Sequence, residues 1–162
     1  MIVTGKTEDG MADGFQRILC PIDFSKHCDE ALKRAAWFAN LSQAEIYLVH
    51  VVANPADHLY APQEVSYWEM VEHADKKAEE LLEQVAQRCL PAACRRRLIV
   101  RQGDPYEKLI EEVTAADIDL IVMSTHGRTG LAHLVLGSVA EKLLRHAPCP
   151  MFVVRRPASK NR

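Results

Sequence analysis

The chain lacks the long apolar segments that mark membrane and secreted proteins. No apolar run among its 162 residues approaches the ~20 residues that a membrane-spanning helix needs. The opening segment MIVTGKTEDGMADG also lacks the apolar core of a signal peptide. We therefore expect a cytoplasmic protein with no membrane partner.

Cysteine occurs without the pairing that disulfides or zinc sites require. The sequence holds five cysteines and no C-x-x-C pair: Cys20, Cys28, Cys89, Cys94 and Cys149. Because an odd number of unclustered cysteines suits neither a disulfide framework nor a structural zinc site, we expect free thiols and no metal site. Cys20 and Cys149 have the character of buried apolar residues, and Cys28 is a candidate for redox sensing.

A strong net charge is absent as well. The 20 basic and 22 acidic residues leave a formal net charge of -2 at pH 7, which gives no general attraction to nucleic acid. The basic run 95–97 is expected to lie at a strand entrance as solvated charge. We therefore expect no nucleic-acid partner.

The phosphate-loop motif G-x-x-x-x-G-K-[ST] is missing too. Without it, no lysine reaches the phosphates of a nucleotide and no neighbouring serine is set to bind magnesium. This absence argues against a fast ATPase. A length of 162 residues, with 48% hydrophobic and 26% charged residues, fits one globular domain with a full core.

Apolar runs and helical patterns alternate along the chain. We expect strands near 17–22, 46–52, 98–100, 119–123 and 151–154, and helices near 26–41, 66–89, 105–116 and 138–146. This alternation predicts an α/β fold, a single doubly wound domain with a five-stranded parallel sheet and helices on both faces. The domain is expected over 15–156, between a flexible leader (1–14) and a tail (157–162). The proline-containing segment 53–65 is either a variable surface loop or a lid.

The segment Ile121–Val154 is the most informative part of the chain. Its pattern is a buried strand, a glycine-bearing loop, a helix and a second strand. Nine residues separate Gly127 from Gly137, and glycine permits close approach of a ligand to the backbone. Ser138 is predicted as the N-cap of the helix, with Glu141 completing a capping box. The first N–H groups of such a helix can bind an anion.

This spacing resembles the nucleotide-binding signature of the universal stress protein family. That signature is glycine, two residues, glycine, nine residues, glycine, then serine or threonine, and the match here is Ser124-x2-Gly127-x9-Gly137-Ser138. Ser124 stands where the signature has its first glycine. The segment 18–39 also resembles the family's first strand, Asp-x-Ser turn and first helix, and the resemblance runs to Arg155.

The resemblance implies a sheet of order 3-2-1-4-5, which makes the strand ends near Asp23 and Ser124 neighbours at the switch point where such sheets bind ligands. It implies a stress-response regulatory protein that binds ATP or another adenine nucleotide, with or without Mg²⁺, and hydrolyses it slowly at most; no catalytic residue is assigned. The implied contacts are Pro21, Ile22, Asp23 and Val51 at the adenine and ribose, Met123, Ser124, His126 and Gly127 at the ribose and first phosphates, Gly137, Ser138 and Val139 at the phosphate tail, and Arg128 as a nearby cation.

The last strand carries a further expectation. Met151–Val154 is apolar and is expected to form a sheet edge, which invites pairing with another chain. The resemblance implies a homodimer through this strand, in which the two sheets continue antiparallel. It also implies a protein partner whose identity is unknown.

Local roles explain some of the same residues without a ligand. Asp23 and Ser25 can form an Asx turn and cap the first helix, Ser138 and Glu141 can be a capping box alone, and His50 can belong simply to its strand. The alternative function is a nucleotide-free dimeric stress protein of the same fold that acts through protein contacts, which Ser124 favours. A ligase-type pyrophosphatase domain is more distant, because its S-G-G-x-[DS] loop is absent.

Overall fold

A computed structural model describes residues 14–52, 67–124 and 137–154 of the chain. The strands in these ranges are β1 (Arg17–Pro21), β2 (Glu45–Val52), β3 (Arg96–Gln102), β4 (Leu120–Ser124) and β5 (Met151–Val154). The helices are α1 (Lys26–Ser42), α2 (Tyr67–Cys89), α3 (Pro105–Ala115) and α4 (Ser138–His146).

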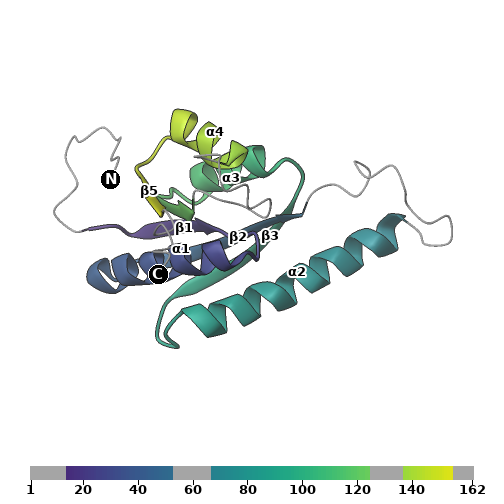
Figure 1. Ribbon diagram of the computed structural model, residues 1–162, viewed down its shortest axis with the longest axis horizontal. Helices are drawn as coiled ribbons and strands as arrows, with labels where there is room; N and C mark the ends of the chain where they lie inside the picture. Colours follow the sequence, from purple (N-terminus) through teal and green to yellow (C-terminus); the bar gives the residue numbers. More distant parts are fainter. Residues whose placement is uncertain (1–13, 53–66, 125–136, 155–162) are drawn as a thin grey trace, which may run out of the picture.

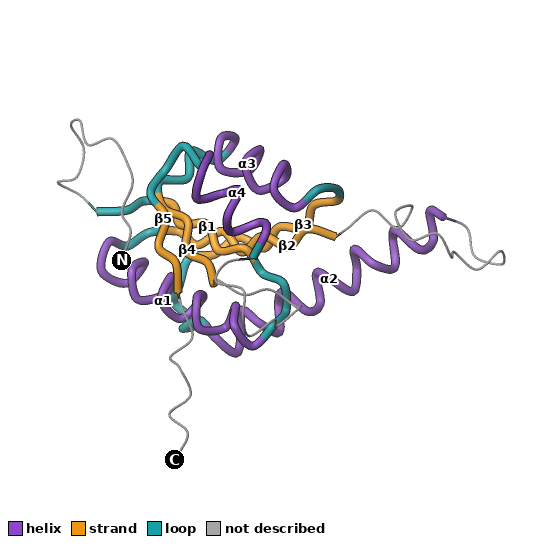
Figure 2. The backbone as a smooth tube through the Cα atoms, turned by 45° about the horizontal axis from the view of Figure 1, so that its top comes forward, coloured by secondary structure: helices purple, strands orange, loops and turns teal. Residues whose placement is uncertain are grey.

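The five strands form one parallel sheet in the order β3-β2-β1-β4-β5. Helices α1 and α2 lie on one face of the sheet, and α3 and α4 lie on the other (Figures 1 and 2). The predicted doubly wound α/β fold and its strand order are therefore confirmed. Parallel strands need such crossover helices, and covering both faces explains why the strands are apolar rather than alternating.

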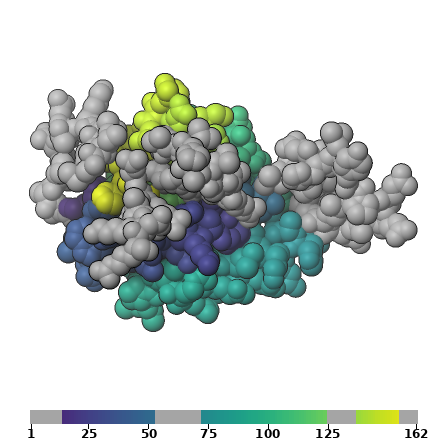
Figure 3. Space-filling view, viewed as in Figure 1, coloured from purple at the N-terminus to yellow at the C-terminus, as the bar shows by residue number. Residues whose placement is uncertain are grey.

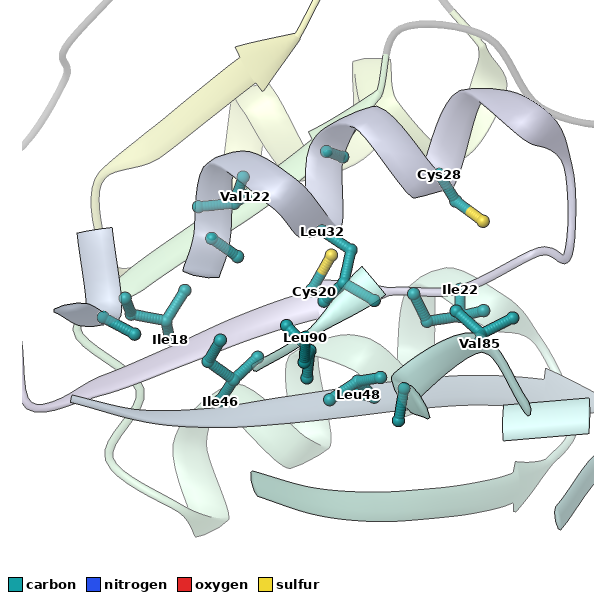
Figure 4. Packing of buried hydrophobic residues seen from close by; sticks show 14 of the residues in the cluster. Ile18, Cys20, Ile22, Cys28, Leu32, Ile46, Leu48, Val85, Leu90 and Val122 are labelled. Carbon is teal, nitrogen blue, oxygen red and sulfur yellow. The ribbon is translucent and has the colours of Figure 1, made fainter. Parts of the chain in front are cut away.

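A first apolar core fills the space between the sheet and the pair α1 and α2. Figure 4 shows its side chains directed toward one another from the strands and the two helices. Leu32 of α1 and Leu48 of β2 are completely buried there. Small residues of α1, such as Ala31 and Ala35, let this helix approach the sheet closely.

A second core lies between the sheet and the pair α3 and α4. It is built around Leu19, Ile121 and Leu143, all of which are completely buried. The free cysteines follow the expected pattern, because Cys20 is buried in the first core and Cys149 in the second. The two cores together hold the central strands between two layers of helices.

Helix starts follow local sequence signals in two cases and depart from them in one. Ser25 caps α1, as the sequence predicts, and Asp104 caps α3 with Pro105 in the first turn, both residue types that favour a helix start. The predicted capping box of α4 is wrong. Gly137, not Ser138, is the N-cap of α4, and no side chain caps it.

Strand β3 is longer than its apolar residues predict. The sequence indicates a strand only over 98–100, but β3 begins at Arg96 and ends at Gln102. The basic run therefore does not stop at the strand entrance, because Arg96 and Arg97 lie in the strand itself. Arg96 pairs with Glu83 of α2 and Arg97 with Glu45 of β2.

Helix α1 presents an exposed outer face as well as its buried one. In the space-filling view, α1 (purple to blue) and α4 (yellow-green) occupy opposite sides of the visible face, with α2 (teal) below α1 (Figure 3). Trp37 and Leu41 of α1 are the large apolar residues exposed on the described surface. None of the helices within the described ranges combines the length and the apolar character needed to cross a bilayer.

The two faces of α1 make a matched test of the first core. We expect Leu32→Ala, at a fully buried position, to lower the free energy of unfolding by about 2–5 kcal/mol, because it removes buried methyl groups and leaves a cavity. Leu41→Ala changes the same residue type on the same helix where the side chain is 64% exposed, and we expect a change within about 0.5 kcal/mol. Urea unfolding of both variants measures the difference; equal losses would contradict the packing described.

Candidate functional site

The candidate site lies where β1 and β4 meet in the middle of the sheet. The register of β1 with β4 ends at Leu19 and Ile121. The pairing of β1 with β2 continues to Pro21, and the pairing of β4 with β5 continues to Ser124. The two central strands therefore leave their common ladder before their carboxyl ends, at the switch point where sheets of this type bind ligands.

Asp119 joins the opposite, amino ends of the same two strands. Its carboxylate accepts hydrogen bonds from the N–H of Gln16 at 2.6 Å and the N–H of Arg17 at 3.1 Å. Its own N–H donates to the Arg17 carbonyl oxygen at 3.0 Å. The strands are thus held together at the amino edge of the sheet.

Ile22 directly follows β1, and both its backbone N–H and its backbone C=O are hydrogen-bonded. Its N–H donates to the Val49 carbonyl oxygen at 2.8 Å. Its own carbonyl oxygen lies 2.6 Å from Nδ1 of His50. Because a carbonyl can only accept, Nδ1 is the protonated nitrogen in this contact. His50 therefore ties the end of β1 to β2.

Phe24 adopts an unusual backbone conformation beside this contact. Its φ is 62°, in the left-handed region that bulky residues rarely occupy, and its ring centroid lies 4.3 Å from that of His50. The turn brings the Ser25 N–H to Oδ1 of Asp23 at 2.9 Å, and Ser25 Oγ accepts from the Cys28 N–H at 3.4 Å. The local roles foreseen for Asp23 and Ser25, an Asx turn and a helix cap, are therefore both present.

His50 is the structural residue of the site that sequence reasoning missed. The sequence assigns it simply to a strand, yet it is a buried polar residue, 8% exposed, that contacts both Ile22 and Phe24. The available signal was a single polar residue inside the apolar run of β2. Such a residue needs a hydrogen-bond partner when it is buried, but its partner is 28 positions away.

The Cys28 thiol is not suited to redox sensing. It is 2% exposed, and its Sγ–H donates to the Ser25 carbonyl oxygen at 2.9 Å. Burial first, and then the negative charges of Asp23 and Asp29, raise the pKa of Cys28 to about 12. Redox-sensing cysteines are accessible and have a low pKa. The sequence-based suggestion for Cys28 is therefore corrected.

The start of α4 offers backbone donors. Gly137 at the N-cap has φ -70° and ψ 151°, and its carbonyl oxygen accepts from the Glu141 N–H at 2.9 Å. Glycine is tolerated at an N-cap, but it has no side-chain oxygen to accept from the first-turn N–H groups. These groups carry the positive end of the helix dipole, so the corrected cap makes this helix start a better anion site than a capping box would.

Helix α4 begins toward the carboxyl edge of the sheet and ends near the amino edge. The helix ends at His146, and β5 begins shortly afterwards at Met151, which pairs with Ile121. The end of α4 must therefore lie near the amino edge. A helix of nine residues is about 13 Å long, so its start at Ser138 lies toward the opposite edge, where β4 ends.

The structure brings the described candidate residues to one edge of the sheet. Their places are the end of β1 and its loop (Pro21, Ile22, Asp23), the end of β2 (Val51), the end of β4 (Met123, Ser124) and the start of α4 (Gly137, Ser138, Val139). His126, Gly127 and Arg128 lie outside the described residues. Ile22 and Met123 are buried and Ser138 is exposed, while the other described candidates are partly buried.

These groups offer hydrogen-bonding and anion-binding contacts to a ligand. Asp23 and the hydroxyls of Ser124 and Ser138 can hydrogen-bond sugar or phosphate groups, and the N–H groups of α4 can hold an anion. Ile22 contributes structure rather than polar contacts, because both of its backbone groups are already bonded. Within the described ranges, no three His, Cys, Asp or Glu side chains are grouped to hold a metal ion.

Comparison with known proteins gives a consistent match over nearly the whole chain. The model of the universal stress protein family matches residues 14–155. A universal stress protein of Methanocaldococcus jannaschii is 33% identical over 144 residues, which cover 88% of this chain and 84% of the relative. One from Thermus aquaticus is 32% identical over 142 residues, covering 87% of this chain and 99% of the relative.

Solved structures share the same fold. The structure of a second Methanocaldococcus jannaschii protein has a TM-score of 0.76 at 26% identity and covers 90% of this chain and 99% of its own. A universal stress protein family member from Arabidopsis thaliana, solved with AMP bound, has a TM-score of 0.62 at 23% identity, with coverages of 90% and 94%. A universal stress protein in complex with cAMP has a TM-score of 0.59 at 18% identity, with coverages of 88% and 98%.

The raised pKa of Cys28 predicts a loss of stability in alkali. The folded thiol keeps its proton to about pH 12, whereas the unfolded thiol loses it near 9.0, so the unfolded state binds fewer protons between these values. The contribution of Cys28 to stability is therefore complete below pH 9 and is lost as the pH rises toward 12, with a slope of about 1.4 kcal/mol per pH unit.

We expect Cys28→Ser, which keeps a hydrogen-bond donor for the Ser25 carbonyl, to lose stability less steeply than the native protein above pH 9. Cys94→Ser, at a more exposed thiol, serves as the control. Urea unfolding at several pH values between 8 and 10.5 measures the slopes. If Cys28→Ser kept the native slope, the buried, protonated state of this thiol would be wrong.

Proposed function

The chain belongs to the universal stress protein family, and we propose that it is a cytoplasmic stress-response protein that binds ATP or another adenine nucleotide at the carboxyl ends of β1 and β4. Binding regulates its contacts with a protein partner, and hydrolysis is slow at most. Mg²⁺ is proposed to accompany the phosphates of the bound nucleotide.

The main support for this proposal is the pairing of β1 with β4. It puts the loop that contains Asp23 beside the strand end that contains Ser124. A carboxylate and a hydroxyl at one switch point suit the hydroxyl groups of a ribose. The apolar side chain of Val51 suits the face of a base, and Met123 offers apolar contact beside Ser124.

The start of α4 supports the placement of the phosphates. Its first N–H groups lack a side-chain cap, and it begins on the side of the sheet where β4 ends. Phosphate at a helix start is stabilised by these N–H groups and by the helix dipole. Ser138 adds an exposed hydroxyl at the same place.

Relatives support the class of ligand. One structural neighbour was solved with AMP and another with cAMP. Both ligands contain adenine, ribose and phosphate, the three groups for which the carboxyl edge of this sheet offers apolar, hydrogen-bonding and anion-binding contacts. An adenine nucleotide is therefore the ligand that this chain is proposed to share with them.

The described residues of the site favour regulation over catalysis. The Asp23 carboxylate already accepts a hydrogen bond from Ser25, and the described residues hold no phosphate loop.

The alternative function, a nucleotide-free protein of the same fold that acts through protein contacts, is favoured by one feature, the Ser124 side chain in place of the first signature glycine.

The difference in charge between the two edge strands favours a homodimer through β5. Strand β5 carries no charged residue along Met151–Val154, whereas β3 at the other edge carries three arginines. Charged side chains on an edge strand oppose pairing with another copy, and an apolar edge permits it. We infer that two copies pair antiparallel along β5.

The nucleotide proposal predicts thermal stabilisation by ligand. We expect millimolar ATP or AMP to raise the melting temperature of the purified protein, because a ligand that binds only the native state stabilises it. Ser138→Asp should keep or slightly raise the melting temperature without ligand, since a negative charge suits a helix start. It should weaken nucleotide binding at least tenfold, because the same charge repels phosphate.

Asn40→Asp is the matched control for this experiment. It adds the same charge at the exposed end of α1, near the amino edge of the sheet, and should leave the nucleotide effect unchanged. Differential scanning fluorimetry and isothermal titration measure the two effects. Absence of any shift in the native protein, with no co-purified nucleotide by mass spectrometry, would overturn the nucleotide proposal and leave the protein-contact alternative.

The dimer proposal predicts an edge-specific effect of charge. We expect the native protein to sediment as a dimer at micromolar concentration and Val153→Glu to sediment as a monomer, because the variant sets like charges against each other across the two-fold axis. Val100→Glu, at a partly buried position of the opposite edge strand, should remain dimeric. A native monomer, or a Val153→Glu dimer, contradicts the interface.

A further inference from the structure

A second site lies on the sheet away from the proposed nucleotide position. A groove of about 770 Å³ runs between β3 and the end of α3. Its lining includes Arg17, Tyr47, Arg97, Ile99, Arg101 and Glu112. None of the described nucleotide-contact candidates lines it. The groove lies on the face of the sheet that α3 covers, next to the edge strand β3.

Strand β3 is open to a further strand. Within the described ranges it pairs only with β2, through the register from Arg96 to Gln102. In a parallel ladder alternate residues direct their backbone groups at the neighbouring strand, so the other residues within the seven of β3 direct theirs outward and form a template for an incoming extended chain. No other described strand lies on that side.

Two arginines mark the face of β3 that borders the groove. Arg97 and Arg101 are four residues apart, so their side chains leave the same face of the strand, about 13 Å apart. Arg97 donates to Glu45 at 3.2 Å and Arg101 to Glu112 at 2.7 Å. Their side chains are still 61% and 46% exposed.

These ion pairs leave donors for a second carboxylate. A guanidinium has five N–H donors. Arg97 uses its Nε for Glu45, while Arg101 uses Nη2 for Glu112 and Nη1 for the Val100 carbonyl oxygen. Glu112 is buried and fixes Arg101 at the wall of the groove. Each arginine is thus positioned by one carboxylate with other N–H groups still available.

The charges of Arg97 and Arg101 indicate which kind of strand can pair with β3. A second copy is disfavoured, because antiparallel self-pairing about Ile99 would set Arg97 of each chain against Arg101 of the other. An extended segment with acidic residues four positions apart meets both arginines with opposite charge. We propose that the outer edge of β3 binds an extended acidic peptide segment of a partner protein as an added strand.

This proposal is independent of the nucleotide site, and it has a different test. The probe is a fluorescein-labelled peptide of sequence Thr-Val-Glu-Val-Thr-Val-Glu-Val-Thr, whose two glutamates are four positions apart. We expect saturable binding by fluorescence polarisation at low salt. Binding should weaken at least tenfold for the double variant Arg97→Gln, Arg101→Gln, in which glutamine can still donate to Glu45 and Glu112.

Two controls separate strand pairing from simple charge attraction. The variant Arg34→Gln, Arg145→Gln removes two exposed arginines from α1 and α4 and should bind the probe like the native protein. A probe with alternate backbone nitrogens methylated keeps both glutamates but cannot form a ladder, and we expect it not to bind. This second control uses only the native protein, so it decides the question even if the arginine variant does not fold.

The proposal would be overturned by no saturable binding of the probe, by equal binding of the methylated probe, or by equal binding to a folded Arg97→Gln, Arg101→Gln variant. Full displacement of the probe by a ten-nucleotide single strand of DNA at an equal concentration would also contradict it, because the edge would then recognise phosphate rather than an extended acidic chain.

Discussion

The parallel pairing of β1 with β4 is the constraint on which the rest of the structure depends. The chain builds β1, β2 and β3 outward in one direction and then returns to the other side of β1. Asp119 makes this return specific by accepting two successive backbone N–H groups at the start of β1. Because the shared ladder ends at Leu19, the carboxyl ends of β1 and β4 are neighbours that do not pair with each other, and the candidate site is a consequence of the topology.

The two edges of the sheet differ because of the same winding. β3 and β5 are both edge strands, yet β3 carries arginines along its length and β5 is apolar. If both proposals hold, one edge is used for a second copy of the chain and the other for an acidic partner. A nucleotide bound at the centre of the sheet would then lie between two interaction surfaces, which is a physical basis for regulation.

Local signals predicted much of this fold, and non-local contacts account for what they missed. The apolar strands and the Asp104-Pro105 helix start depend on residues close together in the sequence, so their positions can be read from the sequence. The ends of β3 were missed because Arg96 and Arg97 enter the strand through partners on other elements. Serine and glycine are both acceptable N-cap residues, and only the backbone geometry of the structure shows that the N-cap of α4 is Gly137 rather than Ser138. The contact of His50 with Ile22 joins two strands, so no pattern in one segment could reveal it.

The most direct test of the central claim is an NMR titration of the ¹⁵N-labelled protein with AMP. The account predicts saturable shifts of backbone amides at the carboxyl edge, at Asp23, Val51, Ser124 and Ser138, together with little change along β3. Saturable shifts confined to β3 or to the exposed face of α1, or the absence of any saturable shift at millimolar AMP, would contradict a nucleotide site at the junction of β1 and β4.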